Sequence, residues 1–161
     1  MKIWMRLAGC ALFAALTAAA HAAPDMFYLQ NGLDGRGRCL GTRGTAVAMA
    51  ACDRAPAQQW IVAPGDLPGH NKLKTAGADD ACLAVHPEAQ RNVLALDACA
   101  AVDDQQWYIE RLSEVPRRMR LTNRATGRTR CLEALQTGFR MTPCSRRQAG
   151  HTWRSETTPD M

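Results

Sequence analysis

The sequence predicts an all-β domain, a sandwich or barrel built from three similar units of about 46 residues. A tryptophan recurs after 47 and then 46 residues, each time at nearly the same distance from a cysteine. Short apolar runs alternate with turn residues, and no segment beyond the N-terminal region keeps the period of an amphipathic helix. Units this small cannot bury an apolar face alone, so we expect all three to share one core. Three-fold packing would close the strands into a barrel without exposed edges.

The three units align through two repeated segments. The first ends in Cys-Leu, and the copies LQNGLDGRGRCL (29–40) and LTNRATGRTRCL (121–132) share seven residues without a gap. LKTAGADDACL (73–83) is a shorter copy of the same segment. The second segment is a cysteine followed after eight, eight and nine residues by a tryptophan. These pairs are Cys52 and Trp60, Cys99 and Trp107, and Cys144 and Trp153.

Each unit is expected to contain about four short strands, which gives about twelve in all. The first two flank a glycine turn and predict a hairpin, as around Gly35 and again around Gly127. A third strand is the apolar run before the second cysteine, at 47–49 and 93–96. The fourth begins at the tryptophan, at 60–62 and 107–109.

Three units with Cys-Leu, a second cysteine and Gln-x-Trp resemble the ricin B-type lectin family, although His151 replaces the glutamine in the third unit. The resemblance covers about residues 26–156 and implies a β-trefoil. From the residues alone, the six cysteines after the N-terminal region allow fifteen pairings. The resemblance implies bonds within each repeat: Cys39–Cys52, Cys82–Cys99 and Cys131–Cys144. The implied repeats are approximately 26–66, 67–114 and 115–156, within a single domain at 23–161.

The residues of the Gln-x-Trp motif are interpreted as structural. Trp60, Trp107 and Trp153 are expected to anchor the core, each with its indole N–H donating to a nearby carbonyl. Gln58 and Gln105 are expected to hydrogen-bond the local backbone and fix the turn.

Sugar binding in the family implies three further positions in each repeat. An acidic residue lies two residues after the first cysteine, an aromatic residue often two before the second, and an asparagine beside the motif glutamine. The first repeat has Gly41, Ala50 and Ala57 there and lacks all three groups.

The second repeat keeps part of this chemistry. Ala84 occupies the acidic position, whereas Asp97 and Asp104 occupy the aromatic and asparagine positions. No stacking platform remains, but Asp97, Asp104 and Gln105 leave a polar rim.

The third repeat is the favoured glycan site. Glu133 takes the acidic position, and Phe139 is the nearest aromatic residue. With Arg140 and His151 these residues would suit an acidic glycan, because guanidinium groups bind carboxylate and sulfate in a bidentate manner. Two structural alternatives stay open: Glu133 pairs with Arg130 or Arg140, and His151 fills a turn position.

The first 22 residues are expected to be a secretory signal peptide cleaved after Ala22. Lys2 and Arg6 give a charged start, and an apolar stretch and small residues follow. The mature chain would then be secreted or periplasmic, and no later segment is long and apolar enough to span a membrane. A lipid anchor at Cys10, in LAGC, is disfavoured because no hydrophobic region precedes it.

The sequence predicts no enzyme, no cofactor and no metal. No serine lies in a nucleophile-elbow pattern, and cysteines committed to disulfides supply neither a thiolate nor zinc ligands. The formal net charge is +5, and the last 47 residues hold ten arginines against three acidic residues. This is a solvated surface or a patch for an anionic partner. No nucleic-acid-binding motif is present.

Two functions are consistent with these features. The first is a secreted, non-catalytic, lectin-like module that binds a glycan, with degenerate sugar positions. The second is a protein-interaction or delivery subunit that holds a toxin's catalytic subunit. A single exported trefoil of this kind is similar to the accessory subunits of cytolethal distending toxins.

Overall fold

The structure is a computed structural model that describes residues 26–157, apart from 34, 36, 89–92 and 114–116. The expected signal peptide and Cys10 lie outside the described residues. The described part contains twelve strands and three short 3-10 helices, and no helix there is long and apolar enough to cross a membrane. The elements are β1 (Met26–Asn31), β2 (Arg38–Arg43), β3 (Ala46–Ala51), η1 (Pro56–Gln58), β4 (Gln59–Pro64), β5 (Asn71–Thr75), β6 (Ala81–Val85), β7 (Leu94–Ala98), η2 (Asp103–Gln105), β8 (Trp107–Ser113), β9 (Arg118–Asn123), β10 (Gly127–Ala134), β11 (Phe139–Pro143), η3 (Ala149–His151) and β12 (Trp153–Thr157).

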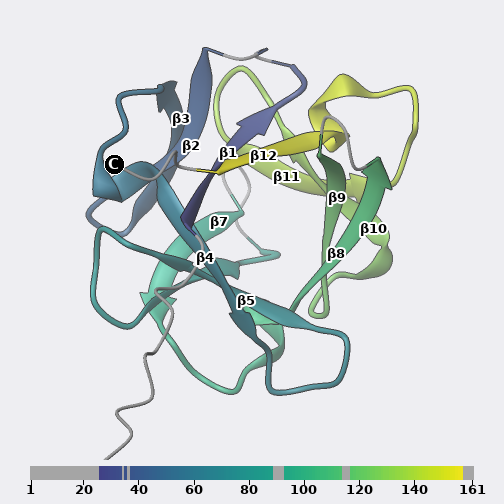
Figure 1. Cartoon of the computed structure of the whole chain (residues 1–161). Helices are drawn as coiled ribbons and strands as arrows, with labels where there is room; N and C mark the ends of the chain where they lie inside the picture. The colour runs from purple at the N-terminus through teal and green to yellow at the C-terminus, as the bar shows by residue number, and fades with distance from the viewer. Residues whose placement is uncertain (1–25, 34, 36, 89–92, 114–116, 158–161) are drawn as a thin grey trace, which may run out of the picture.

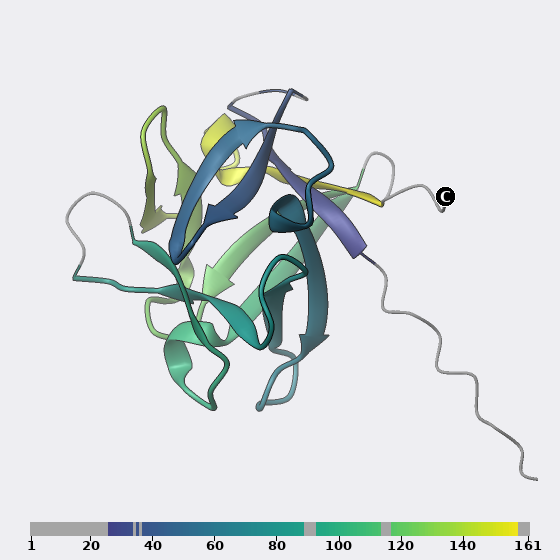
Figure 2. The same ribbon diagram turned by 90° about the vertical axis from the view of Figure 1, so that its left-hand side faces the viewer.

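Six strands form a closed antiparallel ring. β1 pairs with β4, β4 with β5, β5 with β8, β8 with β9, β9 with β12, and β12 returns to β1. Both views show the first and last strands side by side (Figures 1 and 2). The predicted all-β barrel is therefore confirmed, and the ring closes through its two chain ends.

The other six strands form three hairpins, β2–β3, β6–β7 and β10–β11. Each ring strand that precedes a hairpin also pairs briefly with it, as Gln30 in β1 does with Cys39 in β2. The hairpin predicted around Gly35 is therefore only a short pairing of β1 with β2. Most of β1 pairs instead with the ring strand β12, and β2 pairs along its full length with β3. Six ring strands with three hairpins are the β-trefoil architecture that the resemblance implies.

Each tryptophan of the repeat is fully buried and hydrogen-bonded. Its indole Nε1 donates to the carbonyl of the leucine in the Cys-Leu segment of the same repeat, which satisfies the only polar group of the side chain. The tryptophan therefore joins the fourth strand of its repeat to the second. The bonds are Trp60 to Leu40 at 2.9 Å, Trp107 to Leu83 at 2.7 Å and Trp153 to Leu132 at 3.1 Å.

The rest of the core repeats in threes as well. Every strand contributes at least one side chain to the core, and alternation of buried and more exposed positions is clear in β3, β7 and β11. Among the buried side chains at equivalent positions are Leu29, Leu73 and Leu121; Leu40, Leu83 and Leu132; and Val47, Leu94 and Phe139.

The three disulfides close the open ends of the three hairpins. Their Cα–Cα distances are 5.1, 5.0 and 4.9 Å, within the usual range for an unstrained bridge. The bonded pairs are those that the resemblance implies: Cys39–Cys52, Cys82–Cys99 and Cys131–Cys144.

Candidate functional site

The motif glutamines hold the loop that leads from each hairpin to the next ring strand. The Gln58 amide accepts from the Asp53 N–H at 3.0 Å and donates to the Ala51 carbonyl at 2.7 Å. Gln105 makes the same two bonds, to the N–H of Ala100 at 2.8 Å and the carbonyl of Ala98 at 2.9 Å. Both side chains are buried, so they fix the loop rather than face a ligand.

His151 performs this task in the third repeat. Its side chain is 0% exposed, and its Nδ1 accepts the Ser145 N–H at 3.0 Å, as the glutamine oxygen does elsewhere. The ring proton then lies on Nε2, which donates to the hydroxyl of Thr142 at 2.7 Å. The expectation that His151 contacts a ligand is wrong, because the imidazole is enclosed by its own loop.

Replacement of His151 by glutamine should therefore leave the fold intact, within about 1 kcal/mol of wild-type stability. His151→Ala should lose roughly 2–4 kcal/mol, because it leaves a cavity and an unpaired buried N–H. Thermal unfolding of the two variants measures the difference. Equal losses in both would contradict the equivalence of His151 and the glutamines.

Glu133 belongs to the same buried network. Its Oε2 accepts from Arg140 Nε at 2.8 Å and from the Thr142 hydroxyl at 3.0 Å. Only 7% of the residue is exposed. Of the two ion pairs predicted for Glu133, the structure contains the one with Arg140, because Arg130 donates instead to the carbonyl of Met141 at 2.7 Å. The carboxylate is thus occupied by its own repeat.

The Arg140 guanidinium and the Thr142 hydroxyl lower the pKa of Glu133 from its ordinary value of 4.5, with Arg140 the larger cause, although partial burial opposes them. Because the folded-state pKa is the lower one, the stability that Glu133 contributes is present above about pH 4.5. It is lost as the pH falls from there through the folded-state pKa.

Glu133→Gln should accordingly cost about 1–2 kcal/mol at pH 7, as expected for the loss of hydrogen bonds to a charged group. The difference from wild type should shrink as the pH falls below about 4.5. Melting temperatures measured from pH 7 to pH 3 test this. A difference that does not change with pH would show that the charge of Glu133 is not its source.

Phe139 offers no stacking platform. The residue is 1% exposed and lies 6.2 Å from Trp153, ring centre to ring centre, inside the core. It occupies the position of Val47 in the first repeat, on the inner side of its hairpin. The prediction that Phe139 contacts a ligand is therefore wrong. Arg140 remains largely at the surface, but its Nε is bound to Glu133.

Close packing also excludes two side chains that sugar binding in the family would require, the acidic one at Gly41 and the asparagine at Gly150. A Cβ at Gly41, the acidic position, would lie 2.9 Å from Cγ of Gln58. A Cβ at Gly150, the asparagine position, would lie 2.7 Å from the carbonyl oxygen of Ala134. These two positions accept only glycine without a shift of their neighbours.

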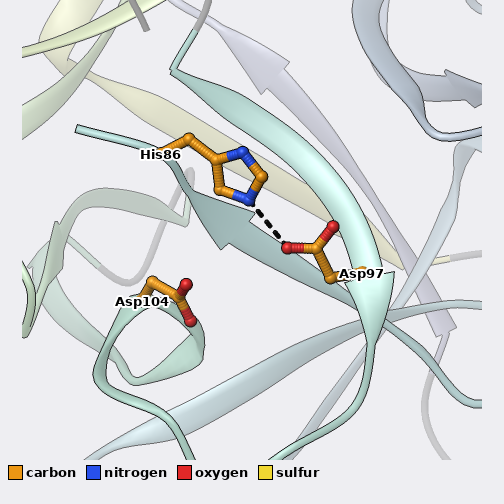
Figure 3. Close-up of side chains that lie close together, drawn as sticks. All are labelled: His86, Asp97 and Asp104. Atoms are coloured by element: carbon orange, nitrogen blue, oxygen red, sulfur yellow. Dashed lines mark hydrogen bonds and ion pairs between the residues drawn. The ribbon is translucent and has the colours of Figure 1, made fainter. Parts of the chain in front are cut away.

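The second repeat brings three polar side chains together at its surface. His86 follows β6 directly, Asp97 lies on β7, and Asp104 lies in η2 (Figure 3). The His86 Nε2 and the Asp97 Oδ2 are 2.7 Å apart, and both side chains are well exposed. One ligand atom from each of the three residues lies within 4.8 Å of the others.

Asp104 is held in a fixed position with an unused acceptor. The Asn123 side-chain amide donates to the backbone carbonyl of Asp104 at 2.7 Å. The next residue, Gln105, is held by the hydrogen bond from its side chain to the Ala98 carbonyl. The Asp104 Oδ1 is buried and accepts no hydrogen bond within the described residues. A buried carboxylate oxygen without a donor is rare, because the described residues do not replace the hydration that it loses.

Within the described residues, His86, Asp97 and Asp104 are also the one group whose geometry could hold a metal ion. The sequence predicts no metal. One neutral imidazole nitrogen and two carboxylates suit zinc or a related ion, with positions left for other ligands. His86 Nε2 and Asp97 Oδ2 are already engaged in a hydrogen bond, so an ion that used these two atoms would have to break it.

The sequence predicts Asp97 and Asp104 for this cluster but not His86 or Asn123. Gln105, which the sequence places at the same polar rim, is buried and holds the loop. His86 has no counterpart in the other repeats, so alignment of the repeats gives it no role. The role of Asn123 is visible in the repeat alignment, because Asn31 occupies the equivalent position of the first repeat. The Asn31 side chain donates at 2.8 Å to the Gly150 carbonyl. The asparagine of one repeat thus holds the loop of the preceding repeat around the ring.

No protein-family model matches the sequence, and no curated protein matches it. Solved structures do. The designed three-fold symmetric protein ThreeFoil is 17% identical with a TM-score of 0.67, over 81% of this chain and 96% of its own. SeviL bound to asialo-GM1 saccharide is 14% identical with a TM-score of 0.63, over 83% of this chain and 98% of its own.

A mosquitocidal holotoxin is 12% identical with a TM-score of 0.70, over 86% of this chain. The match spans only 18% of the holotoxin chain. At these identities the likeness establishes the β-trefoil fold and leaves the function to be argued from the site.

Proposed function

We propose that this protein is a secreted, non-catalytic glycan-binding module whose sugar site lies in the second repeat, at His86, Asp97 and Asp104. The observation that carries the proposal is the buried Asp104 Oδ1, which lacks a donor and lies beside the exposed His86–Asp97 pair. The equivalent loops of the other repeats have Ala57 and Gly150 at the Asp104 position and present no such group.

The chemistry of the cluster fits vicinal sugar hydroxyls. The Asp104 carboxylate and the free oxygen of Asp97 would accept hydrogen bonds from two hydroxyl groups, while His86 offers a ring nitrogen at the edge. Charge-assisted hydrogen bonds to carboxylates are the stronger kind and compensate in part for the missing stacking ring. The loop is preorganised by Gln105 and Asn123, so that little ordering is required on binding.

SeviL, one of the similar trefoils, is described with a bound saccharide, which supports a sugar ligand for this fold. Secretion is supported by the three disulfides, which persist in oxidising compartments. The proposed role is recognition without catalysis.

A glycan-array screen of the oxidised mature protein tests this function. We expect binding to a set of glycans that share one terminal sugar, in the presence of EDTA and equally after addition of zinc or calcium. Binding that requires an added cation would instead make the cluster a metal site. No binding at high protein concentration would contradict the proposal.

The second candidate is a delivery or interaction subunit of a toxin complex. The similarity to one part of a mosquitocidal holotoxin favours it, because a trefoil there belongs to a larger toxin. Affinity capture from the culture fluid of the source organism tests it. A stoichiometric catalytic partner would support this candidate, and its absence together with glycan binding would leave the lectin-like role.

A further inference from the structure

The outer face of β8, β9 and β12 carries an unusual pair of arginines. In the register of β9 and β12, Arg118 lies directly opposite Arg154. Side chains opposite each other in an antiparallel pair lie about 5 Å apart at Cβ, and like charges there are destabilising. Neither arginine makes a salt bridge within the described residues to offset this repulsion.

Two hollows adjoin Arg118. The first, with a volume near 280 Å³, is lined by Arg118 and Arg154 together with backbone around Gly32. The second, near 480 Å³, is lined by Arg118, Arg120 and Arg146, among others. Arg118 and Thr152 line both hollows, so the two hollows are adjacent. We call the two hollows together the arginine groove.

Buried donors in the arginine groove lack acceptors. Arg120 is 7% exposed, and its Nε has no hydrogen-bond partner, although one Nη donates to Glu110 at 3.0 Å. The Nε of Arg154 is buried and unpartnered as well. Unsatisfied buried N–H groups of charged side chains are costly, and these two guanidinium groups are incompletely paired within the described residues. Among the described residues that line either hollow, Glu110 is the one acidic residue.

We propose that the arginine groove binds a sulfated polysaccharide, with one sulfate group held between Arg118 and Arg154. Guanidinium groups bind such oxyanions through paired N–H donors, and two opposed arginines present two forks to one anion. The second hollow, beside Arg118, Arg120 and Arg146, has room for a further charged group of a linear chain.

Two observations favour a polysaccharide over a nucleic acid. Proteins that hold single strands combine a basic groove with aromatic rings on which bases stack. Among the described residues that line either hollow, Trp153 is the only aromatic one, and it is fully buried. The disulfides also place the protein in an oxidising compartment. This inference is independent of the second-repeat site.

Heparin affinity tests the arginine groove. The oxidised protein should be retained on a heparin column and should bind a heparin oligosaccharide in calorimetry. Arg118→Gln with Arg154→Gln should weaken that binding by about tenfold to hundredfold, as expected for lost hydrogen bonds to charged groups. The melting temperature should stay equal or rise, because the double substitution removes a repulsion and no side-chain hydrogen bond or salt bridge within the described residues.

The matched control is Arg43→Gln with Arg54→Gln, which removes the same charge from two exposed residues that do not line the groove. It should weaken binding by less than about threefold, since only long-range attraction is lost. Desulfated heparin should bind poorly. Asp97→Asn with Asp104→Asn should bind heparin as wild type does, so that failure of the second-repeat site and failure of the groove are distinguishable.

Three results would overturn the proposal. The Arg118 and Arg154 double variant could keep its heparin affinity, or the control could lose as much. A single-stranded oligonucleotide of equal charge could compete as well as the sulfated chain, which would assign the groove to nucleic acid.

Discussion

Reduction of the three disulfides should unfold the protein or leave it only marginally stable at room temperature. The bonds join cysteines 13, 17 and 13 residues apart, and each closed loop of this size disfavours the unfolded chain by ~3 kcal/mol. Since the three loops do not overlap, their contributions should add to about 9 kcal/mol. That sum is comparable with the whole stability of an ordinary domain, about 5–15 kcal/mol.

Tryptophan fluorescence during urea unfolding, with and without a reductant, measures this effect. The double variant Cys82→Ala with Cys99→Ala should lose about a third of the total, which separates one bond from all three. A reduced protein with an unchanged unfolding midpoint would show that the shared core suffices without the disulfides.

Replacement of both Asp97 and Asp104 by asparagine should weaken glycan binding by about tenfold to hundredfold, the loss expected for charged acceptors. Stability should change by less than about 1 kcal/mol, because the His86–Asp97 pair is exposed and such pairs contribute little. Calorimetric titration with the best ligand from the glycan array measures the affinity, and thermal unfolding measures the stability.

Asp103→Asn is the matched control for this prediction. Asp103 is next to Asp104 in the same short helix, but its carboxylate pairs with Arg124 at 2.8 Å. The control removes one negative charge from the same loop and should leave glycan affinity within about threefold. Equal losses in the control and the double variant would assign the effect to general charge rather than to the cluster.

The fold was predictable from the sequence because its signals are covalent or periodic. The Cys-Leu and Gln-x-Trp segments recur because each marks a contact that every repeat must make, the indole-to-carbonyl bond and the hairpin disulfide. The glycine turn around Gly35 was correctly placed, with φ near +70°. Its role was overestimated, since the register of β1 is set by distant ring strands that a local pattern does not reveal.

The candidate site was harder to predict, because the sequence does not reveal that the side chains of Phe139 and His151 are buried. Phe139 was assigned to a ligand from its place near Glu133 in the sequence, but alternation along β11 points its ring into the core. His151 stands where the other two repeats have a glutamine that is predicted to be structural. The structure gives His151 the same structural role. Asp104 and Asp97 were correctly grouped, whereas His86 joins them only through the pairing of β6 with β7.

The most direct test of the proposed function is an NMR titration of the ¹⁵N-labelled oxidised protein with its best glycan ligand. The second-repeat account predicts that the largest amide shifts fall at His86, Asp97 and Asp104 and their immediate neighbours, while Glu133 and Gly41 in the other two repeats stay unchanged. The largest shifts at Glu133 and Arg140, or none anywhere at saturating ligand, would contradict it.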